Sequence, residues 1–261
     1  MKTIKKLFYF LSLWLVIIVL AGCVDYSEMV KLPDLEGMSQ AQISAVMDEL
    51  GLSYGFRIEP RVYQNEDEFD KFVRYGNNLR AGKYVCTDEY IPIYTTALPL
   101  TVNRLDEVTL DIDVTGLSFV KDGIGEVTLV RPTDGDTARF RDKITGETFS
   151  VRFLGVDTPE VYNTPEPWGK AASAYTSAAL NNAQTIVLES EGNRKDTYDR
   201  YLAWVWLDGK LHNLDLVQQA YSNAKVGRSS KYFSVFAEVE AEVAKTGRRV
   251  FGELDPSFDY S

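Results

Sequence analysis

Histidine and cysteine are scarce in this 261-residue chain, which has one histidine, His212, and two cysteines, Cys23 and Cys86. Zinc sites in proteins draw mostly on these side chains and need three or four ligands, so the composition argues against a zinc site. We interpret His212 as structural or merely exposed, and Cys86 as a small buried apolar residue. With so few cysteines, stability must come from packing and any bound metal.

Positive charge is also scarce. The chain has 28 Lys and Arg residues against 38 Asp and Glu residues, a net charge of −10. Tight non-specific binding to duplex nucleic acid needs a broad basic face that neutralises many phosphates, and this composition does not favour one. It leaves open chemistry on phosphates at a single, locally positive site. The hydrophobic fraction of 45% is that of a globular protein with real cores.

A long apolar run is present at the amino terminus. Lysines precede the apolar stretch 7–20, and small residues follow it, which is the three-part layout of a secretory signal peptide. The stretch is short for a spanning helix, although a short anchor that stays uncleaved is the alternative. The run Leu20-Ala21-Gly22-Cys23 resembles a bacterial lipobox.

The lipobox resemblance implies a signal peptide over residues 1–22 and a diacylated Cys23 as the first residue of the mature protein. It also implies an extracytoplasmic protein, lipid-anchored to the bacterial cell membrane. Two acyl chains suffice for stable anchoring, at roughly 0.8 kcal/mol for each buried CH₂. A lipidated Cys23 leaves Cys86 without a disulfide partner. Residues 23–30 are then a spacer.

Residues 31–95 predict a small α/β domain. Ser39 is suited to cap a helix, Gly51 to end it, and a strand is expected over 52–58. The helix carries apolar residues at helical spacing: Ile43, Val46, Met47 and Leu50. The segment resembles a PASTA module, which implies a spacer or cell-wall-facing adaptor and makes peptidoglycan a candidate partner.

The pattern of short strands begins at residue 125. Residues 96–124 before it are expected to form a linker or an accessory strand, because 108–114 alternates apolar and polar residues. Five strands with inserted and trailing helices predict an α+β fold built on a five-stranded OB-fold barrel with packed helices. The expected strands are 126–132, 137–141, 148–156, 184–190 and 201–207, and the expected helices are 168–183, 211–221 and 231–245.

Three polar motifs lie at the ends of these strands. They are the turn Asp134-Gly135-Asp136-Thr137, then Arg152 followed by Asp157-Thr158-Pro159-Glu160, then Asp196-Thr197-Tyr198-Asp199-Arg200. Each alone is weak, because Asp-Gly is common turn chemistry. Together, in this order, they resemble the staphylococcal-nuclease (thermonuclease) family over residues 125–255, which leaves 256–261 as a tail.

That resemblance implies a calcium-dependent nuclease. Calcium prefers oxygen ligands in a flexible geometry, and the family pattern makes ligands of the Asp136 and Asp157 carboxylates and the Thr158 carbonyl. Asp134 corresponds to an outer acid that supports the ligands rather than binding the metal. The implied substrate is DNA, with RNA as a second candidate.

The resemblance also gives roles to residues around the phosphate. An arginine fork can bind two phosphate oxygens at once and stays charged, so Arg152 and Arg200 would clamp the phosphate and stabilise the transition state. Glu160 would orient or deprotonate the attacking water. For Tyr198 two interpretations stay open: contact with the sugar or the site wall, or simple packing in the barrel core.

Two departures from the family pattern limit what carries over. Thr197 stands where the family usually has a lysine, and Val226 and Arg228 stand in the region of the family's nucleotide-binding tyrosines. The metal and hydrolysis residues are complete, whereas the base-binding pocket is in doubt.

A membrane-anchored nuclease, expected to be a monomer, is therefore the leading hypothesis. The alternative is a catalytically weak lipoprotein that only binds nucleic acid or the cell wall. Degenerate copies of the barrel normally lose Asp136 or Arg152, and both are present here.

Overall fold

The computed structural model of the chain describes residues 29–59, 68–100, 103–254, 256 and 259–260. The predicted signal peptide, the lipobox and Cys23 lie outside the described residues. No helix among the described residues is long and apolar enough to cross a membrane. The chain divides into two compact units: residues up to 56 with 72–94, and residues 57–71 with 95–261.

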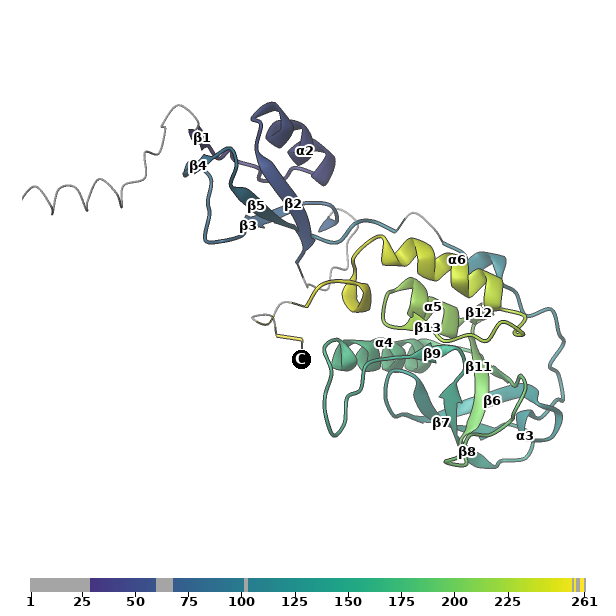
Figure 1. Cartoon of the computed structure of the whole chain (residues 1–261). Coiled ribbons are helices and arrows are strands. Elements are labelled where there is room, and N and C mark those ends of the chain that lie inside the picture. Colours follow the sequence, from purple (N-terminus) through teal and green to yellow (C-terminus); the bar gives the residue numbers. More distant parts are fainter. Residues whose placement is uncertain (1–28, 60–67, 101–102, 255, 257–258, 261) are drawn as a thin grey trace, which may run out of the picture. The chain divides into compact units, whose positions relative to one another are not determined.

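The first unit centres on helix α2 (Gln40–Glu49) and two small sheets (Figure 1). One sheet pairs β1 (Met29–Lys31) with β4 (Tyr84–Cys86), and the other has the order β2 (Ser53–Ile58), β5 (Tyr90–Thr95), β3 (Phe72–Tyr75). The predicted helix and the strand after it are confirmed.

Helix α2 begins at the predicted cap Ser39, which forms a capping box with Gln42. The Ser39 hydroxyl accepts a hydrogen bond from the Gln42 backbone N–H (3.3 Å), and the Gln42 side chain accepts one from the Ser39 N–H (2.9 Å). Ile43 and Met47 are fully buried against the sheets. Cys86, predicted to be buried, is only half-buried, because on its short strand the alternate residue Val85 points into the core.

The second unit is a closed five-stranded barrel, as predicted. Its strands are β6 (Ile124–Pro132), β7 (Thr137–Asp142), β8 (Thr148–Phe153), β10 (Ile186–Glu189) and β11 (Tyr201–Leu207). They pair in the order β10-β6-β7-β8-β11, and β10 also pairs with β11, which closes the barrel. All pairs are antiparallel except β8 with β11, and β12 (Lys210–Leu211) extends β11.

The strand predicted over 148–156 is interrupted. Strand β8 ends at Phe153, and β9 (Val156–Asp157) leaves the barrel to pair with β13 (Asn223–Ala224). Gly155 makes the turn between them with φ +70°, a backbone conformation that glycine adopts without strain. A Cβ there would also lie 2.6 Å from Val226 Cγ2 and 2.8 Å from Trp204 Cη2.

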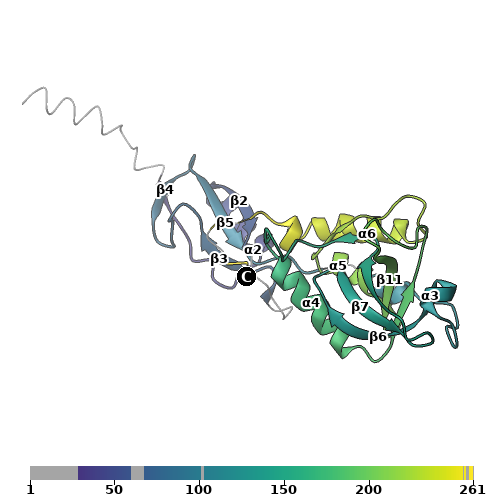
Figure 2. The same cartoon turned by 90° about the horizontal axis from the view of Figure 1, so that it is seen from below.

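Three helices pack on the barrel: α4 (Gly169–Asn182), α5 (His212–Gln218) and α6 (Phe233–Ala244). Helix α5 lies between α6 and the barrel strands, and the view from below shows α4 along another side of the barrel (Figure 2). A short helix η4 (Arg249–Phe251) follows α6. The core includes Phe140, Phe153, Trp204, Trp206 and Phe236, all essentially inaccessible to solvent.

The segment before the barrel forms helix η3 (Leu105–Glu107) and helix α3 (Phe119–Asp122). The accessory strand expected over 108–114 is not formed. Local hydrogen bonds take its place, because the Asp111 carboxylate accepts from the Thr109 hydroxyl (2.9 Å) and the Asp113 carboxylate from the Thr115 N–H (2.9 Å). Such side-chain bonds compete with strand pairing.

Candidate active site

The turn between β6 and β7 holds the most buried carboxylate of the site. Asp136 is 1% exposed, and its Oδ2 accepts hydrogen bonds from the Thr158 N–H (2.8 Å) and the Thr158 hydroxyl (3.1 Å). Its own N–H donates to Asp134 Oδ1 (3.1 Å). Asp134 therefore supports the turn while Asp136 points into the site.

The second motif meets this turn through Arg152 on β8. Its Nη1 donates to Asp136 Oδ1, and its Nη2 donates to Asp157 Oδ1 at 2.6 Å. The Asp157 side chain is 58% exposed, and its backbone N–H donates to the Ser222 hydroxyl (2.7 Å). Two carboxylates from different strands thus converge on one positive charge.

Strand pairing explains why these residues meet. Thr137 lies directly opposite Arg152 in the β7–β8 ladder, so Asp136 and the guanidinium are neighbours across the sheet. Gly135 lets the turn approach the second motif, because a Cβ there would lie 2.5 Å from Thr158 Oγ1. The structure therefore brings together Asp134, Asp136, Arg152, Asp157 and Thr158.

The environment of Asp136 favours a nearby cation. Burial raises the pKa of the Asp136 carboxyl, while the Arg152 guanidinium and the Thr158 N–H oppose that rise. Burial penalises the charged form of a carboxylate. An additional positive charge beside Asp136 would therefore be favourable.

The donor set of this site consists of oxygens. Among the described residues no group of three or more His, Cys, Asp or Glu side chains could hold a metal ion. Two carboxylates and the neighbouring backbone carbonyl are hard ligands of the kind calcium takes. Both carboxylates contact the Arg152 guanidinium and so lie on the same side of the barrel rim, and with water completing the shell these oxygen donors suit calcium by their chemistry.

Glu160 lies in the loop after Pro159. Its backbone is fixed, since its N–H donates to Glu166 Oε2 (3.0 Å) and its carbonyl accepts from the Glu166 N–H (2.9 Å). Its side chain is exposed, and in the described part of the chain its carboxylate has no hydrogen-bond partner. The carboxylate is thus available to a water molecule.

Arg200 is bound to a carboxylate of its own, Asp196. Its Nε and its backbone N–H both donate to the Asp196 carboxylate, at 2.8 and 2.9 Å. Burial alone would raise the pKa of Asp196, but these bonds hold the pKa below its ordinary value. Asp196, which the sequence motif contains but to which no role was given, therefore positions Arg200.

Tyr198 is 80% exposed, so the interpretation that it packs in the barrel core is wrong. It sits in a tight turn, where the Asp196 carboxylate accepts from its N–H (2.9 Å). The Arg200 guanidinium lies 5.5 Å from the Tyr198 ring centroid. Its position at the surface beside an arginine leaves it free to contact a ligand.

Two supporting contacts carry no signal in the sequence. The Thr176 hydroxyl on α4 donates to the Gly135 carbonyl (2.6 Å) and lies 3.2 Å from His212 Nε2. His212 is buried, so the interpretation that it is merely exposed is wrong, and burial lowers its pKa to about 4. Ser222, which anchors Asp157, likewise lies in no motif.

Comparisons with known proteins agree with this geometry. The family described as "Staphylococcal nuclease homologue" matches residues 150–250. A thermonuclease of Staphylococcus intermedius is 41% identical over 126 residues, which cover 46% of this chain and 73% of that protein. A thermonuclease of Staphylococcus hyicus is 36% identical over 127 residues, which cover 47% and 73%.

A third relative is similar to this chain over only a small part of its own length. The endonuclease YhcR of Bacillus subtilis is 32% identical over 139 residues, covering 48% of this chain and 11% of that protein. The matched residues 150–250 do not include the turn that carries Asp136. In the structure this turn, between β6 and β7, lies next to Arg152. On its sequence and its barrel alike, the chain belongs to the staphylococcal nuclease family and is a nuclease that hydrolyses phosphodiester bonds.

Proposed function

We propose that this chain is a calcium-dependent nuclease that hydrolyses DNA, with RNA as a second candidate substrate, at the outer face of a bacterial membrane. The observation that carries the proposal is the convergence of Asp136 and Asp157 on the guanidinium of Arg152. Opposite charges gathered at one point suit attack of water on a phosphodiester.

Each residue has a role that follows from its contacts. Asp136, Asp157 and the Thr158 carbonyl would hold calcium, which when bound supplies a Lewis acid to the phosphate. Both terminal nitrogens of Arg152 donate to these carboxylates, and calcium bound by the carboxylates would free the guanidinium fork beside the metal. Arg152 would therefore bind two phosphate oxygens.

The remaining roles belong to Glu160 and Arg200. The exposed carboxylate of Glu160 would accept the proton of the attacking water. Arg200, held by Asp196 through Nε, keeps its terminal nitrogens for the phosphate and its developing charge. Tyr198, exposed beside it, would contact the sugar.

Hydrolysis of single-stranded DNA, duplex DNA and RNA in a calcium titration tests the proposal. We expect acid-soluble nucleotides to be released with calcium and not with a chelator. Glu160→Gln removes the proton acceptor and keeps the shape, so its kcat should fall by about 10²–10⁴. An unchanged kcat in Glu160→Gln would refute the mechanism, because that carboxylate would then move no proton.

The location and the first unit belong to the same proposal. The lipobox resemblance supports a lipid anchor at Cys23, and the PASTA resemblance supports contact between residues 31–95 and peptidoglycan. The nuclease unit would then work outside the cell, close to the membrane. Co-sedimentation of the full chain with purified peptidoglycan, compared with a cellulose control, tests the wall contact, and equal recovery with both materials would refute it.

A further inference from the structure

The outer face of the barrel carries a row of arginines, of which the proposed mechanism uses only Arg152 and Arg200. Side chains alternate between the two faces of a strand, and on β7 the buried Ala138 and Phe140 point into the core. Arg139 and Arg141 therefore point outward. On β8 the buried Phe149, Val151 and Phe153 place Arg152 on the same outer face.

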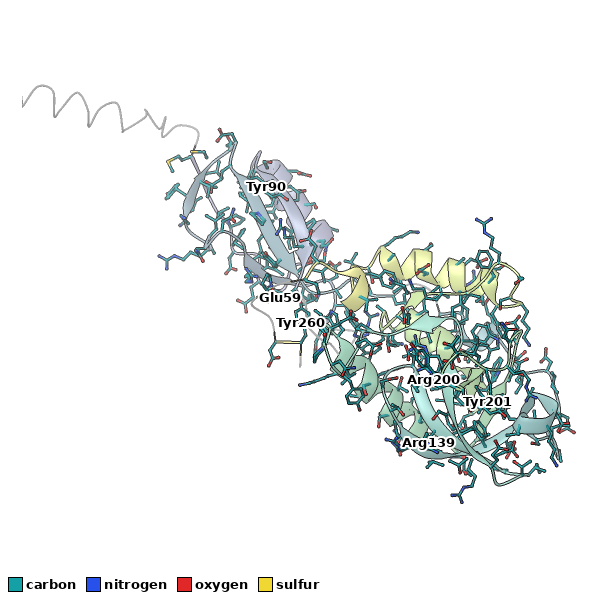
Figure 3. The ribbon with its side chains drawn as sticks, turned by 60° about the horizontal axis from the view of Figure 1, so that its bottom comes forward. Glu59, Tyr90, Arg139, Arg200, Tyr201 and Tyr260 are labelled. Atoms are coloured by element: carbon teal, nitrogen blue, oxygen red, sulfur yellow. The ribbon has the colours of Figure 1, made fainter. Side chains whose placement is uncertain are left out.

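Strand register places Arg139 next to the candidate active site. Arg139 lies opposite Ser150 on β8 and opposite Arg131 on β6. Arg200 precedes β11, in which Leu202 lies opposite Arg152, so Arg200 continues the row on the far side of Ser150. Figure 3 shows Arg139 and Arg200 on neighbouring parts of the barrel. Arg139 is one diagonal step from Arg152, with strands about 4.8 Å apart and alternate residues about 7 Å apart.

The hydrogen bonds of these arginines differ. Arg152 and Arg200 are paired with carboxylates. By contrast, neither the Arg139 nor the Arg131 side chain has an ion pair or hydrogen bond with any described residue, and the buried Nε of Arg139 has no acceptor. The buried Nε is out of reach of a ligand, so a phosphate would bind the terminal nitrogens of Arg139, for which no described residue supplies an acceptor.

The charge of the whole chain sharpens this contrast. With a net charge of −10, the chain as a whole repels a polyanion, and the positive charges of Arg139 and Arg131 form a site where a phosphate backbone is attracted. Guanidinium groups recognise phosphate through paired hydrogen bonds. The spacing of alternate outer-face residues is close to that of consecutive phosphates in an extended strand.

We infer that Arg139, with Arg131 beside it, binds a phosphate of a single-stranded nucleic acid, adjacent to the phosphate held at Arg152. This subsite rests on the proposed function, since the strand it guides is the one cleaved there. A phosphate contact at Arg139 should make longer strands bind more tightly than shorter ones, and it should not discriminate between bases. The subsite extends the phosphate-binding surface from Arg152 on β8 across Arg139 on β7 toward Arg131 on β6.

Binding of labelled single-stranded DNA of about 12 nucleotides to the full chain, followed by fluorescence anisotropy with EGTA present, tests the subsite. We expect Arg139→Gln to raise Kd about tenfold, the effect of one charge-assisted hydrogen bond. Between about 50 and 200 mM salt the slope of log K against log salt should flatten by about 0.7, one phosphate contact. Arg131→Gln, at an exposed position, should act in the same direction.

Lys121→Gln is the matched control, because Lys121 is an exposed lysine on α3. It removes one positive charge from the same unit, and its Kd should change less than about twofold, since exposed distant charges are screened. Equal loss in Arg139→Gln and Lys121→Gln, or no loss in either arginine variant, overturns the inference. The anisotropy experiment measures binding and not hydrolysis. A chain that binds through Arg139 but releases no nucleotides with calcium would therefore refute the proposed function and leave the subsite intact.

Discussion

At the scale of single residues, Asp136 ties the site together. One of its oxygens accepts from Thr158 and the other from Arg152, so a single carboxylate joins the end of β9 to the side of β8. Replacing it would disconnect two motifs at once. Asp134, two residues earlier, accepts only the Asp136 N–H in this network, which makes it a natural comparison.

His212 makes a prediction about pH at this scale. Its folded pKa of about 4 lies below the ordinary value of 6.5 because the ring is buried, so the unfolded chain binds the proton more readily. The free energy of unfolding is then unaffected above about pH 6.5 and falls as pH drops toward about 4. Between about pH 7 and pH 5 the loss should be about 2 kcal/mol.

Urea unfolding of the chain and of His212→Gln at both pH values measures this loss. The Gln side chain can still donate to the Thr176 hydroxyl but does not titrate, so the variant should lack the His212 share of the pH dependence. Identical pH dependence in the two proteins would show that His212 does not titrate as its burial requires.

Sequence motifs predicted some of the residues of this site but not the residues that support them. The motifs identified both carboxylates, Thr158 and Arg152, because each motif follows a recognisable strand. They did not indicate that Thr176 supports the Gly135 carbonyl or that Ser222 holds Asp157. Those contacts come from helix and strand packing between residues far apart in the chain, which no local pattern records.

At the scale of elements, the turn at Gly155 decides where Asp157 points. The sequence predicted one strand through 148–156, because the apolar run continues across the glycine. The break arises because β9 pairs with β13 instead of continuing in the barrel. Alternation predicts which residues are extended, but pairing partners depend on long-range register.

Gly155→Ala and Gly146→Ala separate packing from backbone strain. Both glycines have similar positive φ, +70° and +72°, but a Cβ at Gly146 meets nothing within 4 Å whereas one at Gly155 meets Val226 and Trp204. Gly146→Ala should lower the free energy of unfolding by about 1–2 kcal/mol. Gly155→Ala should lower the free energy of unfolding by about 1–3 kcal/mol more than Gly146→Ala does.

Chemical denaturation measures both variants. Gly155→Ala should also reduce hydrolysis more than Gly146→Ala, because moving β9 displaces Asp157. Equal destabilisation by the two substitutions would mean that the contacts around Gly155 relax without cost.

At the scale of the whole molecule, the nuclease unit is joined to a first unit and to an amino-terminal run that carries the lipobox pattern. If Cys23 carries two acyl chains, the full-length protein should sediment with membranes, since two chains anchor stably. Cys23→Ser should release the nuclease to the soluble fraction without loss of specific activity. Membrane fractionation followed by a hydrolysis assay measures both, and a variant that stays with the membrane would contradict lipid anchoring through Cys23.

We propose that Asp136 and Asp157 hold calcium for phosphodiester hydrolysis, and a calcium titration of kcat in Asp136→Asn and Asp134→Asn decides whether they do. Asp136→Asn should lose activity by about 10² or more and need more calcium, because the ion loses a charged ligand. Asp134→Asn, which can still accept the Asp136 N–H, should lose less than about tenfold. Equal loss in the two variants, or full activity in Asp136→Asn with calcium chelated, would contradict the account.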